Sequence, residues 1–168
     1  MSKIISRLMK NLNEESREKG LVQIRLKGEI EFFVRDKYGR LKYYRVIKNL
    51  IVNAGLSEII KLIGGLGGTP FRYIAIGTGT TSPSATDTAL EGEVARASAS
   101  VSQVTTDVDG DTLQLEATFS FSASYSITES GVFNADSDGV MLARQTFPAI
   151  NVVSGDQLTV RWKIQASR

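Results

Sequence analysis

Residues 113–121, Leu113-Gln114-Leu115-Glu116-Ala117-Thr118-Phe119-Ser120-Phe121, alternate between apolar and polar side chains without a break. Successive side chains of a β-strand point to opposite faces, so this period of two predicts a strand with one buried face. The same alternation returns from Leu158 to Ile164, where the single tryptophan, Trp162, stands at an apolar position. These two stretches indicate a mainly β fold.

Further extended stretches lie on either side of these two and are separated by turns rich in Asp and Gly. Regular spacing of such strands is typical of antiparallel β-proteins. The sequence therefore predicts an antiparallel β-sandwich or jelly roll over residues 64–168, without specifying the order of its strands. The other expected strands are 71–76, a long one over 94–106, 126–134 and 140–147, and the expected turns are 107–111 and 136–139.

The first 63 residues have a different pattern. Residues 2–18 place apolar side chains at helical spacing, which predicts an amphipathic helix whose stripe is Ile4, Ile5, Leu8, Met9 and Leu12. Its bases precede its acids, an order that the helix dipole disfavours, so this helix should need a partner surface. Residues 21–47 predict a hairpin about the turn Asp36–Arg40. Residues 49–63 predict a short helix, which Gly55 could divide into two pieces.

Charge divides the chain at about the same place. Residues 1–63 hold 14 Lys and Arg against 7 Asp and Glu, a formal charge of +7, whereas residues 64–168 hold 6 against 11, a charge of −5. Opposite charges on two parts of a protein allow each part to meet a different partner. We therefore expect a basic docking region over 1–63 and a sandwich domain over 64–168.

The composition excludes several classes of function. The sequence has no Cys and no His, so it lacks thiolates, disulfides, the commonest general base near neutral pH and the commonest transition-metal ligand. It therefore predicts a protein that is not an enzyme and that uses no cofactor. No run of about 18 apolar residues is present to span a membrane. Residues 1–16 lack the apolar core and the cleavage site of a signal peptide.

Three motifs invite a chemical interpretation, but each also has a structural one. Gly77-Thr78-Gly79 lacks the third glycine or the Gly-Lys-Ser/Thr ending of a phosphate-binding loop. Asp107, Asp109 and Asp111 could offer oxygens to calcium, but their spacing is not that of an EF-hand, and Asp favours turns for backbone reasons alone. Glu129 stands between apolar positions, so a buried carboxylate there should need hydrogen-bond or ion-pair partners. We predict no catalytic, cofactor-binding or metal-binding residue.

The hairpin interleaves tyrosines with cations, notably Lys37, Tyr38, Arg40 and Lys42. Such a pattern could bind nucleic acid, could dock on an acidic protein surface, or could simply cover apolar surface with long side chains. Acidic residues interrupt the basic stripe, which favours a protein partner over nucleic acid.

Five ordered motifs follow one another in the second part of the chain. They are YIAIGTGTT at 73–81, ATDTALEGE at 85–93, TESGVFN at 128–134, LARQ at 142–145 and VVSGD at 152–156. Together with the lead-in NLIVNAGL at 49–56, they resemble a family of small virion proteins of tailed bacteriophages, described as tail-fibre-like, minor structural or capsid-decorating. The resemblance covers residues 48–166 and implies a structural, non-catalytic role and assembly as a homo-oligomer, such as a trimer. Residues 1–47 lie outside it.

The resemblance leaves two places on the virion open. The favoured interpretation is a capsid decoration or cement protein, held on the outside of the head through its N-terminal region by the major capsid protein or other virion proteins. The alternative is a component of the tail tip, baseplate or tail fibre, whose loop 78–93 would contact a host glycan. Both imply localisation to the virion, with assembly in the host cytoplasm, and neither requires a membrane or nucleic acid. The candidate partner-binding residues are Lys3, Ile5, Arg7, Leu8, Lys10, Lys37, Tyr38, Arg40 and Lys42.

Overall fold

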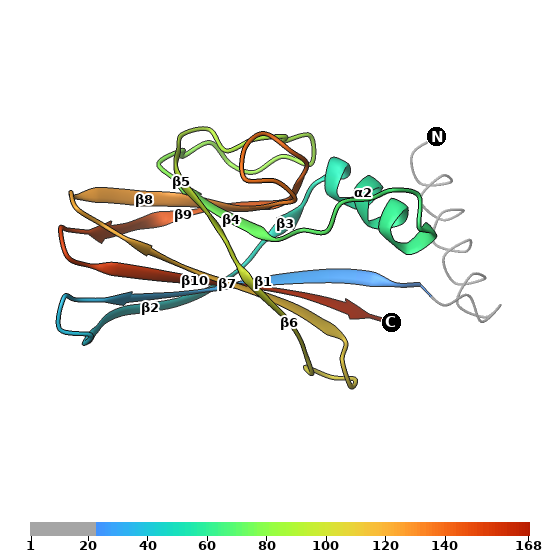
Figure 1. Ribbon diagram of the computed structural model, residues 1–168, viewed down its shortest axis with the longest axis horizontal. Coiled ribbons are helices and arrows are strands. Elements are labelled where there is room, and N and C mark those ends of the chain that lie inside the picture. The colour runs from blue at the N-terminus through green and yellow to red at the C-terminus, as the bar shows by residue number, and fades with distance from the viewer. Residues whose placement is uncertain (1–22) are drawn as a thin grey trace, which may run out of the picture.

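The computed structural model describes residues 23–168, which form two five-stranded antiparallel sheets and one short helix (Figure 1). The first sheet has the strand order β2-β1-β10-β7-β6, and the second has the order β3-β9-β8-β4-β5. The mainly β, antiparallel fold predicted from the alternation is confirmed. The helix predicted over 2–18 lies outside the described residues. The elements are β1 (Arg25–Arg35), β2 (Leu41–Lys48), β3 (Leu50–Ile51), α2 (Asn53–Gly64), β4 (Tyr73–Gly77), β5 (Glu93–Ser98), β6 (Ser100–Val104), β7 (Thr112–Ser120), β8 (Tyr125–Phe133), β9 (Met141–Val152) and β10 (Gln157–Ser167).

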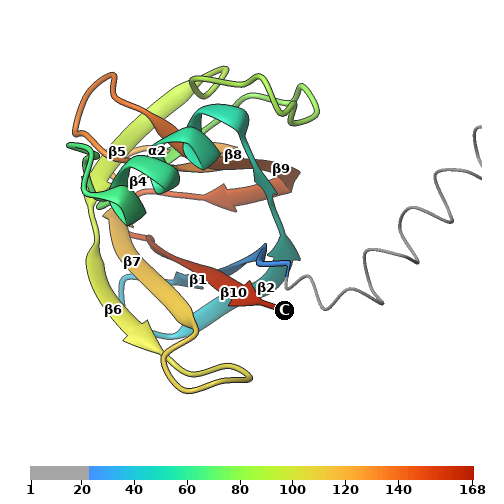
Figure 2. The ribbon, with the colours of Figure 1, turned by 90° about the vertical axis from the view of Figure 1, so that its right-hand side faces the viewer.

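The apolar core lies between the two sheets, which Figure 2 shows as two layers. The register places Ile30 of β1, Trp162 of β10 and Leu115 of β7 side by side across the first sheet, and all three side chains are fully buried. Trp162 also donates its indole N–H to Ser130 Oγ of the second sheet at 3.1 Å. The alternating stretches at 113–121 and 158–164 therefore supply the inner face of the first sheet, as their period of two predicts.

The hairpin of β1 and β2 belongs to this sheet. β1 pairs with β10 along its whole length, from Arg25 opposite Ser167 to Arg35 opposite Gln157, and it contributes buried residues such as Phe32 to the core. The expected division at residue 63 therefore does not separate the hairpin from the sheets. Charge could not show this, because the charged residues of β1 lie on the outer face; Glu31, for example, binds cations of β10 there.

The stretch 94–106 is not one long strand, as the sequence predicts, but two. β5 pairs with β4 in the second sheet, and β6 pairs with β7 in the first. Between them Ala99 donates its backbone N–H to the carbonyl of Arg72 at 2.8 Å, so the chain changes sheets at this residue. Strands that change sheets in this way make the corners of two-sheet folds.

The helix expected over 49–63 begins four residues later. Leu50 and Ile51 pair with β9, and α2 then runs as one helix from Asn53 to Gly64. Gly55 does not divide it. A Cβ at Gly55 would lie 2.5 Å from the carbonyl oxygen of Leu142, so the glycine allows α2 to pack directly on the backbone of β9.

Candidate functional site

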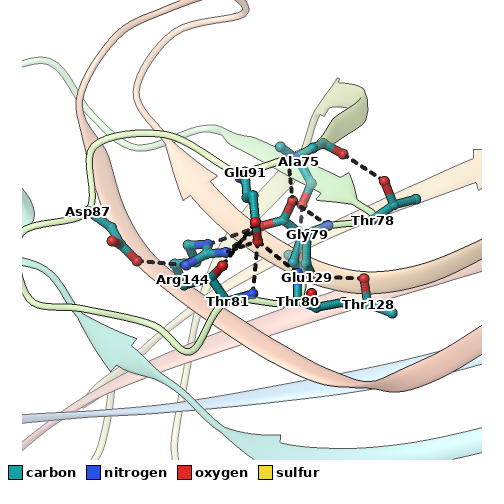
Figure 3. Close-up of polar contacts among 12 residues, drawn as sticks. Ala75, Thr78, Gly79, Thr80, Thr81, Asp87, Glu91, Thr128, Glu129 and Arg144 are labelled. Atoms are coloured by element: carbon teal, nitrogen blue, oxygen red, sulfur yellow. Dashed lines mark hydrogen bonds and ion pairs between the residues drawn. The ribbon is translucent and has the colours of Figure 1, made fainter.

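Glu129 of β8 is fully buried beneath the loop that joins β4 to β5 (Figure 3). Its Oε1 accepts the backbone N–H groups of Gly79 and Gly92 at 2.9 and 2.7 Å, and its Oε2 accepts the N–H of Glu91 at 3.1 Å. The partners that the sequence required for a buried carboxylate at this position are therefore present. They come from both ends of the loop.

Arg144 of β9 is the ion-pair partner of Glu129. Its side chain is buried, with Nε and Nη2 at 3.0 and 2.9 Å from Glu129 Oε2. Its Nη1 donates to Asp87 Oδ2 at 2.8 Å. Burial works against the charged guanidinium, but the hydrogen bonds and charges of Asp87 and Glu129 outweigh it and raise the pKa of Arg144. The arginine is thus a permanent cation between two carboxylates.

The loop itself supplies two of these acids. Glu91 accepts the backbone N–H groups of Thr80 and Thr81 at 2.8 Å each and the Thr81 hydroxyl at 2.9 Å, and these bonds lower the pKa of Glu91. Burial opposes the charge on Asp87, but a backbone bond from Ser84 and the contact with Arg144 still lower the pKa of Asp87. We call Asp87, Glu91, Glu129 and Arg144 the loop anchor, because together they fasten residues 77–93 to β8 and β9.

The Gly77-Thr78-Gly79 motif is explained by the same contacts. A Cβ at Gly77 would lie 2.6 Å from both Glu129 Oε1 and the carbonyl oxygen of Gly92, and a Cβ at Gly79 would lie 2.5 Å from Glu129 Oε1. Both glycines are therefore needed for a close approach to the buried carboxylate. The amide of Gly79 is used within the protein, where a phosphate-binding loop would present it to a ligand.

The loop anchor suits a structural task better than a chemical one. A general acid or base works best with a pKa near the operating pH and within reach of a substrate. Asp87 and Glu91 instead have lowered pKa values and remain charged, and Glu129 is closed off from solvent. What the arrangement does is hold the 15 residues between β4 and β5 in one shape.

A second feature lies at the tip of the β1–β2 hairpin, at the end of the molecule farthest from α2 (Figure 1). Asp36 accepts the backbone N–H groups of Tyr38 and Arg40 at 2.9 and 3.0 Å, and Gly39 takes a positive φ of 79°, as the turn prediction required. Tyr38 is 70% exposed, and Lys37 Nζ and Arg40 Cζ each lie 5.1 Å from the centre of its ring. Arg40 also forms an ion pair with Asp36 at 2.7 Å, which holds its guanidinium beside the ring. The turn thus presents to solvent an aromatic ring with two cations beside it, and the acid of the turn balances the charge of one of them.

The predicted partner-binding residues divide into three groups. Lys37, Tyr38 and Arg40 are brought together at this tip. Lys42 lies on β2, where its Nζ is 2.6 Å from Asp156 Oδ2, so its charge is balanced within the protein, and this bond lowers the pKa of Asp156. The remaining five, which fall outside the described residues, are Lys3, Ile5, Arg7, Leu8 and Lys10.

The Asp107–Asp111 segment is a turn fastened by its last residue. Asp111 accepts the backbone N–H groups of residues 106–108 at 2.8, 3.0 and 3.1 Å and a bond from Gln165 at 2.8 Å. Desolvation opposes its charge, but the bonds from Gln165 and the backbone prevail and lower the pKa of Asp111. Among residues 23–168, no three or more acidic side chains are grouped so that they could hold a metal ion.

Sequence reasoning singled out Glu129 but missed Arg144 and Asp87. A signal was present for the arginine, since Arg144 follows Met141-Leu142-Ala143 in a stretch as apolar as the one around Glu129. Two opposite charges at apolar positions of neighbouring strands are candidates for a buried pair. Nothing local in the sequence points to Asp87, because it lies 57 residues from Arg144.

The helix in the described part of the chain lacks the length and the apolar character needed to cross a membrane. Comparison of the chain with protein-family models, with curated proteins and with solved structures finds no match.

Proposed function

We propose that the protein is a non-enzymatic structural protein of a tailed-bacteriophage virion, and that it decorates the outside of the head. The virion setting rests on the resemblance of residues 48–166 to small phage virion proteins. The observation that carries the docking role is the exposed cluster of Lys37, Tyr38 and Arg40 at the hairpin tip.

The cluster continues along the outer side of β2 as an apolar and basic surface. Tyr38, Leu41, Tyr44 and Val46 are 70, 52, 51 and 41% exposed, and β2 is an edge strand of the first sheet. Aromatic residues and arginine are enriched where proteins meet, and neighbouring exposed apolar side chains mark such places. We call these four residues, with Lys37 and Arg40, the hairpin surface. It fits an acidic protein surface, as on a neighbouring capsid subunit.

The interior of the molecule is built for stability, which suits a structural protein. The loop anchor fixes the loop 77–93 through buried charges, and Trp162 joins the two sheets. Such a body keeps its shape while its hairpin surface and N-terminal residues bind.

Quantitative mass spectrometry of purified particles tests the location. A decoration protein should remain with isolated heads, in a copy number comparable to that of the major capsid protein. A few copies per particle that separate with isolated tails would contradict the proposal and support a place in the tail tip, baseplate or fibre.

A binding experiment tests the surface. Purified protein is added to heads assembled without it, and the bound fraction is measured against concentration. The double variant Lys37→Glu with Tyr38→Ala should bind at least tenfold more weakly. The control Arg72→Glu, which changes an exposed arginine outside the hairpin, should bind like the unchanged protein. Equal binding by the two variants would show that the hairpin surface does not contact the head.

A further inference from the structure

Helix α2 exposes large apolar side chains beside polar ones such as Ser57 and Lys61. Its buried residues are Gly55 and Glu58, whereas Ile60 and Ile63 are 63 and 78% exposed. A surface helix normally turns its apolar stripe to the core and its polar residues to solvent. The orientation of α2 therefore leaves an apolar face without a partner among residues 23–168.

This face borders a groove at the end of the molecule opposite the hairpin tip, the end toward the viewer in Figure 2. The groove has a volume of about 1070 Å³ and runs between α2, β3 and the start of β1. Its apolar lining includes Ile24, Leu26, Leu56, Ile59, Ile60 and Ile63. Ile24, the residue directly before β1, is part of the wall of the groove, so the chain N-terminal to it starts from the groove.

The charged residues at the rim of the groove indicate what kind of segment could bind in it. The charged residues of the lining are Lys27, Lys48 and Lys163 against one acid, Glu29, which stands opposite Lys48 in the register of β1 and β2, so the rim is basic on balance. An occupant that fits should combine an apolar stripe with acidic residues near Ile24. The segment that precedes Ile24 has this composition, because its stripe is followed by residues 14–19, which hold three acids, Glu14, Glu15 and Glu18, against two bases, Arg17 and Lys19.

Chain connectivity favours the same segment. Three residues separate Gly20 from Ile24, and so short a connection spans at most about 14 Å even when fully extended. A helix over residues 2–18 would be about 25 Å long, enough to lie along the whole of α2. A short link also gives the segment a high effective concentration at the groove, on the order of millimolar.

We propose that residues 2–18 of this chain pack their apolar stripe into the groove beside α2. In this arrangement Ile5 and Leu8 are buried against Ile60 and its neighbours, whereas the basic residues Lys3 and Arg7 face outward. The proposal does not rest on a virion role. It gives the N-terminal residues two roles. Their apolar side chains pack against the body of the protein, and their cations stay exposed and can bind a partner.

Engineered disulfides test the contact in the full chain, because the protein has no cysteine of its own. The stripe pairs are Leu8→Cys with Ile60→Cys and Leu12→Cys with Ile60→Cys, and the control pair is Lys10→Cys with Ile60→Cys on the polar side of the predicted helix. Each is oxidised mildly at about 1 μM protein and analysed by non-reducing electrophoresis and mass spectrometry.

We expect at least one stripe pair to form a disulfide within one monomer. The control pair should give at most a tenth of that yield. Disulfide-linked dimers whose yield rises with protein concentration would overturn the proposal in favour of a second copy as the occupant. Equal yields for stripe and control pairs, or no disulfide at all, would also overturn it.

Hydrogen exchange gives a readout that does not depend on the choice of pair. In the full chain, Ile5→Asp with Leu8→Asp should expose α2 and speed exchange of the amides of residues 56–63 at least tenfold. Lys10→Asp, on the polar side, should leave them unchanged. Fluorescence of Trp162 reports in parallel that the sheets remain folded. Unchanged exchange in α2 with the sheets intact would show that the stripe does not cover the groove.

Discussion

Replacement of Glu129 by glutamine tests whether the loop anchor holds residues 77–93 in place. The substitution keeps the size of the side chain but removes its charge and turns one acceptor oxygen into a donor amide. Whichever way this amide points, it faces donors: the N–H groups of Gly79 and Gly92 on one side, the guanidinium of Arg144 on the other. At least one buried donor therefore loses its acceptor.

The size of the effect follows from burial. Breaking a buried ion pair by removal of one partner costs about 3–5 kcal/mol, because the other charge stays buried. Arg144 keeps Asp87 at 2.8 Å, which places Glu129→Gln at the lower end, about 3 kcal/mol. For a chain of this size, that loss lowers the melting temperature by about 6–12 °C.

Denaturant unfolding followed by fluorescence of the single tryptophan, Trp162, measures the loss. The control is Glu116→Gln on the outer face of the first sheet, where the carboxylate is 34% exposed and 2.7 Å from Arg161 Nε. Ion pairs on the solvent face of a protein contribute about 0.2–1 kcal/mol, and this partly exposed pair should lie near the upper end of that range. Hydrogen exchange at the amides of Gly79 and Gly92 should speed up in Glu129→Gln alone.

The prediction is wrong if Glu129→Gln costs no more than Glu116→Gln and hydrogen exchange at Gly79 and Gly92 is unchanged. That result would mean that the loop keeps its shape without the buried charge.

Three more outcomes are expected. Gly55→Ala should destabilise the protein by about 1–3 kcal/mol in thermal unfolding, despite the better helix propensity of alanine, because the added Cβ meets the backbone of Leu142; the exposed control Ser57→Ala should change stability by a few tenths of a kcal/mol at most. Ser130→Ala should cost about 1–3 kcal/mol in the same assay, since it leaves the buried indole N–H of Trp162 without an acceptor. Stability measured against pH should be constant from about pH 6 to 7.5, because the sequence has no histidine. It should fall as the pH drops below the ordinary carboxyl values of 4.5 and 3.8, because lowered folded-state pKa values mean that the unfolded chain binds more protons there. A loss of stability between pH 6 and 7.5 would contradict this assignment. The carboxylates with lowered pKa values include Glu31, Asp87, Glu91, Asp111 and Asp156.

The elements that sequence predicted best are those whose signal is local. The period of two over 113–121 depends only on which face of a strand is buried, so it predicted both the strand β7 and its inward side chains. The turn at Asp36–Arg40 needed only one residue with positive φ and one capping carboxylate. Glu129 was singled out because an isolated charge among apolar neighbours has few physical solutions.

The rest depended on contacts between distant residues. The change of sheet at Ala99 leaves no mark in the sequence, because small side chains lie on both sides of it and suit either sheet. The meeting of Asp87 with Arg144 requires the whole second sheet to be in register. The place of β1 was obscured by its outer charges, which dominate its composition although its inner face decides its packing.

The central position of β10 has a consequence for the order of events in the cell. β10 lies between β1 and β7, so the earliest described strand to leave the ribosome bonds on one side to the last. At ordinary elongation rates, about ten seconds pass between them. During that interval the apolar face of β1, with Ile30 and Phe32, has only β2 beside it. The first sheet therefore cannot be completed until residues 157–167 have left the ribosome, and a nascent chain that stalls before residue 157 exposes surface for chaperones and proteases to recognise.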